Sequence, residues 1–185
     1  MHDPSSPDLV TLAQRGDMEA IGALYDMHYR AVFRYFRSRV GDGQLAEDLT
    51  GEAFRRMLTG LPQYRPMGLP FRAWLFRIAH NLLIDHYRQE SGHMLVELQE
   101  TDRYGEGEGE GDPAPVVERK LTLEQANRAL SELDAPQRDV LTLRFLSGLS
   151  LREVALALNK TEDSVKALQR RGLAALRLTL IQSEP

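Results

Sequence analysis

The chain contains no cysteine, which excludes disulfide bonds and thiolate metal sites. No apolar run approaches the roughly 20 residues that are needed to span a bilayer. The N-terminal stretch MHDPSSPDLV lacks the basic and then apolar pattern of a secretory signal. Strict alternation of polar and apolar residues, which is typical of β-strands, is also scarce. These absences favour a helical, cytoplasmic protein that does not insert into a membrane.

Motifs of catalytic and cofactor sites are missing as well. The sequence holds no glycine-rich phosphate loop, no Gly-x-Ser-x-Gly motif and no Cys/His pair. His80, Asp85 and His86 raise the question of a metal, but the two histidines are six positions apart and diverge around a helix. A zinc site needs about three converging protein ligands. We therefore expect no cofactor, no metal and no enzymatic activity.

Negative charge is concentrated in one segment of a chain whose net charge is −4. Residues 1–90 are balanced, residues 91–118 have a net charge of −7, and residues 119–185 have a net charge of +3. The acidic segment contains GEGEGEGD, which can bury almost nothing and repels itself, so we expect it to be disordered. The pattern predicts a domain over 1–90, an acidic linker over 91–117 and a second domain over 118–185.

Both flanking parts carry apolar residues at steps of three and four, which indicates amphipathic helices. In the first part we predict a short helix that stops at Gly16, a long one that ends near GDG, and two more around 45–57 and 71–89. In the second part we predict helices over 121–133, 136–146, 150–158 and 162–180. The expected fold is all-α: two small helical domains, each packed independently, joined by a flexible acidic linker.

The stretch SLREVALALNKTEDSVKALQRRGLAAL, residues 150 to 176, predicts two helices joined by a tight turn. Ser150 and Glu153 form a capping-box pattern, Asn159 suits a left-handed helix end, and Thr161 can cap the next helix. This spacing is that of a helix-turn-helix, whose second helix enters the major groove of DNA. A helical hairpin with a solvated charged face is the alternative. The outward side of the second helix is predicted to hold Lys166, Arg170 and Arg171.

Residues 64–89 combine a stiff loop with an aromatic and basic helix. Pro66, Gly68 and Pro70 keep the loop out of a helix. Arginines beside aromatic residues suit opened DNA, because the backbone meets charge and unstacked bases meet π-faces. The alternative is that Phe71 and Trp74 belong to the core. The polar residues that can share an exposed side of this helix are Arg72, Arg77, Asn81 and Arg88.

The helix predicted at 45–58 is acidic on one side, with Glu47, Asp48 and Glu52. Acidic residues near a helix N-terminus match the helix dipole, and that explanation would suffice for this segment alone. A functional role for these carboxylates therefore depends on the rest of the chain.

Three segments together resemble the sigma factors of the extracytoplasmic-function (ECF) type, which belong to the sigma-70 family. They are AEDLTGEAF, FRAWLFRIAHNLLIDHYR and SLREVALALNKTEDSVKALQRRGLAALR, in that order, and the resemblance covers about 7–90 and 118–181. It implies an initiation factor that joins core RNA polymerase, reads promoter DNA and can have an anti-sigma factor as a further partner. It also implies that the acidic linker threads the polymerase cleft where nucleic acid later lies.

The same resemblance assigns roles to individual residues. Those expected to bind polymerase are Glu47, Asp48, Glu52 and Phe54; those expected to open and read the −10 element are Tyr64, Arg65, Arg72, Arg77, Asn81 and Arg88; those expected at the −35 element are Ser164, Lys166, Arg170 and Arg171. The chain departs from the family pattern at Gly51, where Gln is usual, and at Leu168 and Gln169, where the polar and apolar order is exchanged. Gly172 either permits close helix packing or only softens its helix.

Two other classes of protein are weighed against this interpretation. A stand-alone helix-turn-helix regulator would explain the C-terminal part but would leave 45–58 and 64–89 without a task. An enzyme acting on small molecules would need a set of convergent titratable groups, and the sequence nominates none. Whether the two domains touch each other is left open by the sequence.

Overall fold

The structure of the protein is a computed structural model that describes residues 7–91 and 128–182. The predicted acidic linker, apart from Ser91, and most of the helix predicted over 121–133 lie outside the described residues. Within the two described ranges the regular structure is entirely helical, which confirms the all-α prediction. None of the helices in these ranges has both the length and the hydropathy that crossing a membrane requires.

Residues 7–91 form an N-terminal unit with the four predicted α-helices. Gly16 (φ +86°) follows the first helix and Gly41 (φ +73°) the second, and glycine adopts such left-handed conformations without steric cost. Asp17 caps the second helix by accepting two backbone N–H bonds. The elements are α1 (Pro7–Gln14), α2 (Met18–Val40), α3 (Gly43–Gly60), the 3-10 turn η1 (Leu61–Gln63) and α4 (Phe71–Glu90).

Residues 128–182 form a C-terminal unit. The helix predicted over 136–146 is divided, because Ser147 N–H donates to the carbonyl of Thr142, five residues back, at 3.0 Å and widens the last turn. After Gly148 (φ +72°) the chain enters the helix-turn-helix. The elements are a helical end at 128–131, α6 (Ala135–Leu141), the π-helical segment η2 (Thr142–Leu146), α7 (Leu151–Leu158) and α8 (Glu162–Gln182).

The local signals of the helix-turn-helix are confirmed. Ser150 and Glu153 make both hydrogen bonds of the capping box at the start of α7. Asn159 ends that helix in a left-handed conformation, with φ 54° and ψ 46°. The hydroxyl of Thr161 accepts the backbone N–H of Ser164 at 3.1 Å and so caps α8. The turn between the two helices therefore follows from its own sequence.

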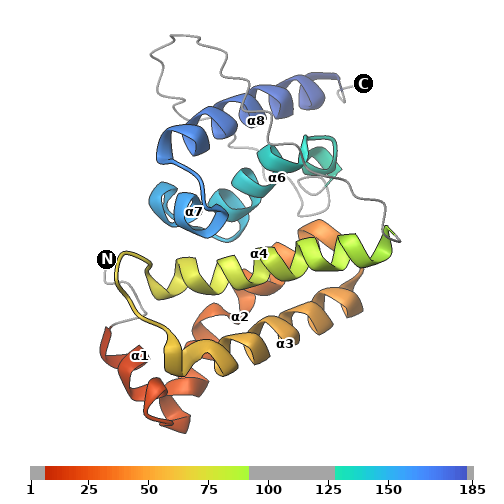
Figure 1. The fold of residues 1–185 in the computed structure, drawn as a ribbon. Helices are drawn as coiled ribbons and strands as arrows, with labels where there is room; N and C mark the ends of the chain where they lie inside the picture. Colours follow the sequence, from red (N-terminus) through yellow and green to blue (C-terminus); the bar gives the residue numbers. More distant parts are fainter. Residues whose placement is uncertain (1–6, 92–127, 183–185) are drawn as a thin grey trace.

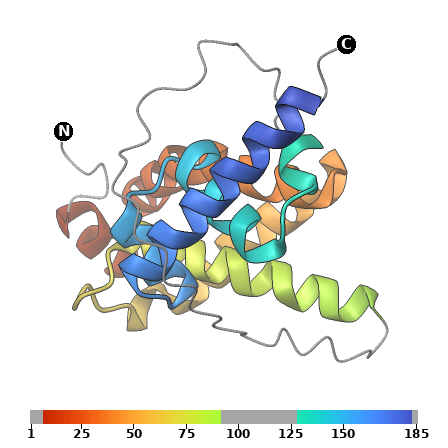
Figure 2. The same cartoon turned by 90° about the horizontal axis from the view of Figure 1, so that it is seen from above.

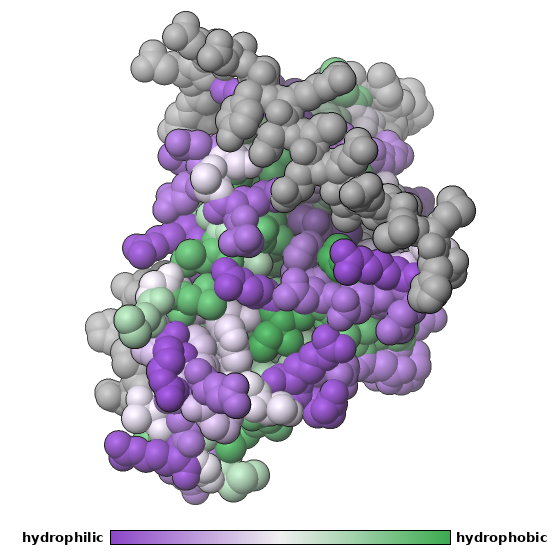
Figure 3. All heavy atoms as spheres, viewed as in Figure 1, coloured by the Kyte–Doolittle hydropathy of each residue, from purple (hydrophilic) through white to green (hydrophobic). Residues whose placement is uncertain are grey.

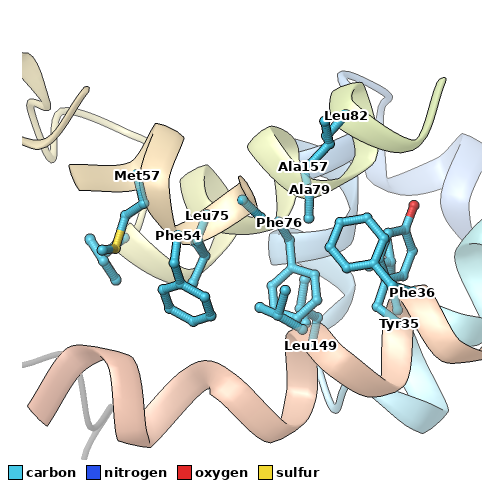
Figure 4. Packing of buried hydrophobic residues seen from close by; sticks show 14 of the residues in the cluster. Tyr35, Phe36, Phe54, Met57, Leu75, Phe76, Ala79, Leu82, Leu149 and Ala157 are labelled. Atoms are coloured by element: carbon cyan, nitrogen blue, oxygen red, sulfur yellow. The ribbon is translucent and has the colours of Figure 1, made fainter. Parts of the chain in front are cut away.

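The two units pack against each other, with α4 between α2 and α3 on one side and α6, α7 and α8 on the other (Figure 1). Viewed from above, α8 crosses over this stack of helices (Figure 2). One apolar core runs through both units, and Figure 4 shows Leu149 and Ala157 of the C-terminal unit among Phe76, Ala79 and Leu82 of α4. The sequence left open whether the two domains touch each other. Here they do, because α7 packs along one side of α4 and η2 contacts α2.

Candidate nucleic-acid interface

The loop before α4 is held in one shape by hydrogen bonds and ring contacts. The Tyr64 side chain is only 5% exposed, and its hydroxyl donates to the carbonyl of Leu69 at 2.7 Å. Its ring lies 4.7 Å from that of Trp74 and edge-on to Phe71 at 5.8 Å, between centroids. Gln14 of α1 donates to the Tyr64 carbonyl at 2.8 Å. Tyr64, expected to read DNA, is placed to shape the loop from within.

The outer side of this loop presents Arg65 and Met67 instead. The Arg65 guanidinium donates to the carbonyl of Tyr64 at 2.9 Å, and Arg65 is exposed. Met67 is 89% exposed, which is unusual for a long apolar side chain. Met67 was not among the residues predicted to contact DNA, although its position between Pro66 and Gly68 in a stiff loop is a usable signal.

Trp74 and Phe71 mainly support the loop. A Cβ atom at Gly60 would lie 3.0 Å from the Trp74 ring, so this glycine lets the end of α3 approach the indole closely. Phe71 is buried, and Trp74 is half-buried against the core. This arrangement favours the alternative in which both aromatic residues pack in the core.

The polar residues of α4 that were expected to contact DNA fall into two groups. Asn81 and Arg88 are exposed, as expected. Arg72 and Arg77 are half-buried, because the C-terminal unit lies on their side of the helix. The Arg72 guanidinium donates to the carbonyl of Ser147, and that of Arg77 donates to the carbonyl of Leu156, its Nε at 3.2 Å. The expectation that all four share an exposed side therefore holds for only two of them.

These bonds belong to a larger contact that we call the domain seam, made by α2 and α4 on one side and by residues 139–158 on the other. Within it, Arg39 pairs with Asp139, and the two side chains are 3% and 11% exposed. The Tyr87 hydroxyl donates to the Arg39 carbonyl at 2.8 Å. The Ser147 hydroxyl donates to the carbonyl of Ala31 at 3.3 Å. The seam thus combines a buried ion pair with several hydrogen bonds.

Electrostatics at the seam keep its buried groups in fixed charge states. Burial works to lower the pKa of Arg39, but Asp139, Tyr35 and Tyr87 together outweigh it and the pKa is raised, so the guanidinium stays charged. His80 is bonded to the Tyr35 hydroxyl at 3.0 Å. Burial lowers the pKa of His80, and the neighbouring Arg39 adds to the effect, which favours a neutral imidazole at neutral pH.

The cations of α8 lie on an accessible surface. Lys166, Arg170 and Arg171 are exposed, and Lys166 lies 3.4 Å from the carboxylate of Asp163. Ser164 is half-buried at the start of the helix. On the opposite side of α8, Val165, Leu168 and Gly172 are buried.

Gly172 settles one alternative that the sequence leaves open. A Cβ atom there would lie 2.9 Å from Cδ1 and 3.2 Å from Cγ of Leu141 in α6. Real Cβ atoms do not approach other atoms this closely, so the glycine permits tight packing of α8 on α6. That packing fixes the direction in which the cations of α8 point.

The acidic side of α3 presents two accessible carboxylates. Glu47 and Asp48 are exposed, whereas Phe54 is 3% exposed and belongs to the core. Glu52 is held by Arg55 and Arg56, and their hydrogen bonds lower its pKa to about 2. In the view of Figure 3, polar residues cover much of the described surface, with apolar patches between them. Glu47 and Asp48 are therefore the acids of α3 best placed to meet a partner.

Comparison with known families matches both units. Residues 24–92 match the family described as Sigma-70 region 2, and residues 129–178 match Sigma-70, region 4. The two matches fall on either side of the acidic segment and include α3, α4 and the helix-turn-helix.

Curated relatives are similar over most of this chain. The ECF RNA polymerase sigma factor BldN of Streptomyces coelicolor is 37% identical over 91% of this chain, which spans 63% of that protein's length. The ECF RNA polymerase sigma factor SigD of Mycobacterium bovis is 33% identical, over 91% of this chain and 81% of its own. SigX of Bacillus subtilis, of the same description, is 27% identical over 86% and 82%.

Two solved structures share the fold. CnrH, in complex with the cytosolic domain of CnrY, has a TM-score of 0.72 at 24% identity and covers 96% of this chain and 97% of its own. The sigma factor RpoE of Bartonella quintana, in complex with the anti-sigma factor NepR, has a TM-score of 0.68 at 22% identity and covers 90% and 100%. The similarity extends over both helical units.

Proposed function

This chain belongs to the ECF RNA polymerase sigma factors of the sigma-70 family, and we propose that it joins core RNA polymerase and directs transcription initiation to specific promoters. It acts as a binding factor with no catalytic site of its own, in the cytoplasm, where polymerase and promoters are. The observation that carries the proposal is the ordered pair of sigma-70 regions, 2 and then 4, on one chain.

The C-terminal unit reads the −35 element through α8. Its exposed Lys166, Arg170 and Arg171 supply positive charge for phosphates and donors for base edges, and Ser164, in the first turn of the helix, contacts a phosphate. The support is geometric: α8 is the second helix of the helix-turn-helix, and Gly172 fixes its seat on α6.

The N-terminal unit opens and reads the −10 element through the loop and α4. Arg65 and Met67 form the outer side of the loop, while the buried Tyr64 holds its shape. An exposed apolar side chain beside a cation suits an unstacked base and the phosphate next to it. Arg72, Arg77, Asn81 and Arg88 supply polar groups along α4, the first two once the C-terminal unit has moved away.

Polymerase binds the acidic side of α3. Glu47 and Asp48 are the exposed carboxylates there, and Glu52 is ionised at neutral pH, since its pKa is about 2. Phe54 does not contact polymerase directly; it anchors α3 in the core, where its ring centroid lies 4.6 Å from that of Tyr25. An anti-sigma factor is a further proposed partner, because the similarly folded sigma factor RpoE of Bartonella quintana is in complex with the anti-sigma factor NepR.

The test is run-off transcription with purified core polymerase on a genomic library, with start sites mapped. Addition of this protein is expected to give discrete start sites that share −35 and −10 sequences. Unchanged start-site selection would contradict the proposal. The same promoters, as duplexes without polymerase, should bind the isolated protein weakly, since tight sequence-specific duplex binding is what a stand-alone regulator would show.

A further inference from the structure

We propose that the protein has a binding site for a small phosphate-bearing anion, in a pocket between the two units at the C-terminal end of α2. The pocket has a volume of about 270 Å³. Its lining includes Arg37, Arg39 and Gly41 of the N-terminal unit and Arg128, Ser131 and Arg138 of the C-terminal unit. None of these residues has a role in the proposed contacts with promoter DNA or polymerase, so the inference goes beyond that function and does not depend on it.

The lining of this pocket carries positive charge that is not matched by negative charge. Among the described residues that line it are four arginines and no carboxylate. Asp139 pairs with Arg39 from behind, and this leaves Arg37, Arg128 and Arg138 without a salt bridge within residues 7–91 and 128–182. Four guanidiniums against one carboxylate give an excess of three positive charges, which an anion would balance.

Two of these arginines are held in place by backbone carbonyls, which carry no net charge. Arg138 donates from Nε to the carbonyl of Leu130 at 2.8 Å and from Nη2 to that of Leu133 at 3.0 Å. Arg37 donates from Nη1 to the carbonyl of Gly41, where α2 ends. These hydrogen bonds position the guanidiniums without neutralising them. Side chains that are already positioned lose less conformational entropy when a ligand binds.

Two further observations indicate that the cations crowd one another. Burial lowers the pKa of Arg138, and the nearby charge of Arg39 lowers it further. The Nε atom of Arg39 is buried and has no hydrogen-bond acceptor among the described residues. A buried charged donor without an acceptor is unfavourable, and so is a group of like charges in a partly buried place. A bound anion would relieve the repulsion among the guanidiniums.

The size and the charge of the pocket indicate which anion it takes. Pockets for drug-sized ligands measure about 300–1,000 Å³, so this smaller pocket suits a single phosphate or diphosphate group. A phosphate monoester carries a charge of about −1.5 to −2 at neutral pH, more than a carboxylate does. An excess of three positive charges therefore favours phosphate, whose oxygens also match the planar fork of a guanidinium. Arg128 and Ser131 are exposed at the rim, so a larger part of the ligand would remain in solvent.

The pocket is complete only where the two units meet. Arg37 and Gly41 lie at the end of α2, whereas Arg128 and Arg138 lie in the helical end at 128–131 and in α6. A ligand that contacts both sets binds the folded chain and not the unfolded one, so it raises the free energy of unfolding as its concentration rises. The unfolding temperature is therefore a second measure of binding.

The experiment titrates the full chain with pyrophosphate by isothermal calorimetry, at constant ionic strength and in a buffer without phosphate. Arg37→Gln and Arg128→Gln each remove one charge, from opposite sides of the pocket. Each should weaken pyrophosphate binding by about tenfold or more, as expected for the loss of a charge-assisted hydrogen bond. Pyrophosphate should also raise the unfolding temperature of wild type more than that of either variant. Absence of saturable binding to wild type would overturn the inference.

Matched variants separate this site from a general attraction to basic surfaces. Arg34→Gln and Arg177→Gln make the same change at exposed positions on α2 and α8 that do not line the pocket, and both should bind pyrophosphate as wild type does. If they weaken binding as much as Arg37→Gln and Arg128→Gln do, the effect is one of net charge and the inference is overturned. Because Arg128 is exposed, its replacement decides the question even if Arg37→Gln does not fold.

Three further ligands identify what the pocket recognises. If ADP binds about as tightly as pyrophosphate, the site takes the diphosphate of a nucleotide, and if ADP binds much more weakly, it takes the inorganic ion; either result supports a phosphate site. Succinate, a dicarboxylate, should bind about tenfold more weakly or worse, and equal binding would overturn phosphate recognition. A short DNA duplex should not displace pyrophosphate. Displacement would mean that these arginines contact the DNA backbone, which would overturn a small-molecule site.

Discussion

The two candidate DNA-binding surfaces of this molecule are held in opposite ways. On α8, Arg170 and Arg171 lie exposed on the outer face of the helix-turn-helix. On α4, Arg72 and Arg77 are half-buried and bonded to carbonyls of the C-terminal unit. Local sequence sets the side of a helix on which a cation lies, but packing by distant residues decides whether that cation is available. The candidate surface on α8 is therefore accessible in this arrangement, whereas the candidate surface on α4 is partly covered.

The largest effect should come from the exposed surface. Arg170→Ala with Arg171→Ala should lower transcription from −35-dependent promoters by about 10- to 100-fold, since a lost base or phosphate contact costs about 1–3 kcal/mol. Run-off assays with core polymerase measure this. Arg177→Ala, at an exposed position later on α8, is the control and should have little effect. If the double variant instead lost its association with polymerase, the assignment of −35 recognition to the C-terminal unit and of polymerase binding to the N-terminal unit would be contradicted.

A second exposed surface allows the N-terminal unit to be tested without touching the seam. Glu47→Lys with Asp48→Lys should weaken association with core polymerase by roughly tenfold, because like charges placed across an interface are costly. Pull-down with core enzyme gives the readout. Glu132→Lys with Glu162→Lys makes the same change of charge on the C-terminal unit and should leave association intact. Unchanged binding of the first variant would refute the assignment of α3.

The packing of α8 on α6 can be disturbed at Gly172. Gly172→Ala should destabilise the protein by about 1–3 kcal/mol, as overpacking does, because the new methyl group would lie 2.9 Å from Leu141 Cδ1. Leu141 is itself 1% exposed and has little room to move. Urea unfolding measures the change. A neutral result would mean that α8 is seated more loosely than its contacts indicate.

At Gly51, in the N-terminal unit, substitution by alanine is expected to stabilise the protein, in contrast to Gly172. Nothing lies within 4 Å of a Cβ atom built there, and its φ is that of an ordinary helix. Gly51→Ala should therefore stabilise the protein by about 0.5–1 kcal/mol through helix propensity alone. The same urea titration serves as the assay, and a loss of stability would contradict the open surroundings of this residue.

The smallest effect is expected at the seam, from His80. Its pKa is lowered by burial, so between that value and the ordinary pKa of about 6.5 the unfolded chain binds a proton that the folded chain does not. Stability is then fully present above about pH 6.5 and declines as the pH falls. Asp139, which raises the pKa, keeps the effect modest. Unfolding midpoints at neutral and mildly acidic pH should differ less in His80→Gln than in wild type; an identical difference would exclude His80 as the cause.

Much of the fold follows from short stretches of sequence. The capping box at Ser150 and Glu153, the left-handed end at Asn159 and the stop at Gly16 were all predicted, because each depends on residues within one or two turns. The order of helices and their apolar sides follow from periodicity in the same way. What these signals share is that their partners lie close by in the chain.

The parts that could not be predicted depend on contacts between distant residues. Nothing in the neighbourhood of Arg39 or Asp139 indicates that they pair across 100 positions. The half-burial of Arg72 and Arg77 follows from the same docking. Tyr64 reads in sequence as a polar aromatic residue of a loop, but its ring fills the space beside Trp74. Exposure of a side chain is a property of the whole fold, which local patterns do not contain.

Arg39 and Asp139, the ion pair at the seam, belong to one polypeptide, so the contact between the two units does not depend on the concentration of the protein. Docking of two parts of one chain proceeds at an effective concentration set by the connecting segment, which does not change when the protein is diluted. The fraction of molecules with an uncovered α4 is therefore the same whether the cell holds few copies or many. A ligand that prefers an undocked arrangement would shift this equilibrium, whereas a change in the amount of protein would not.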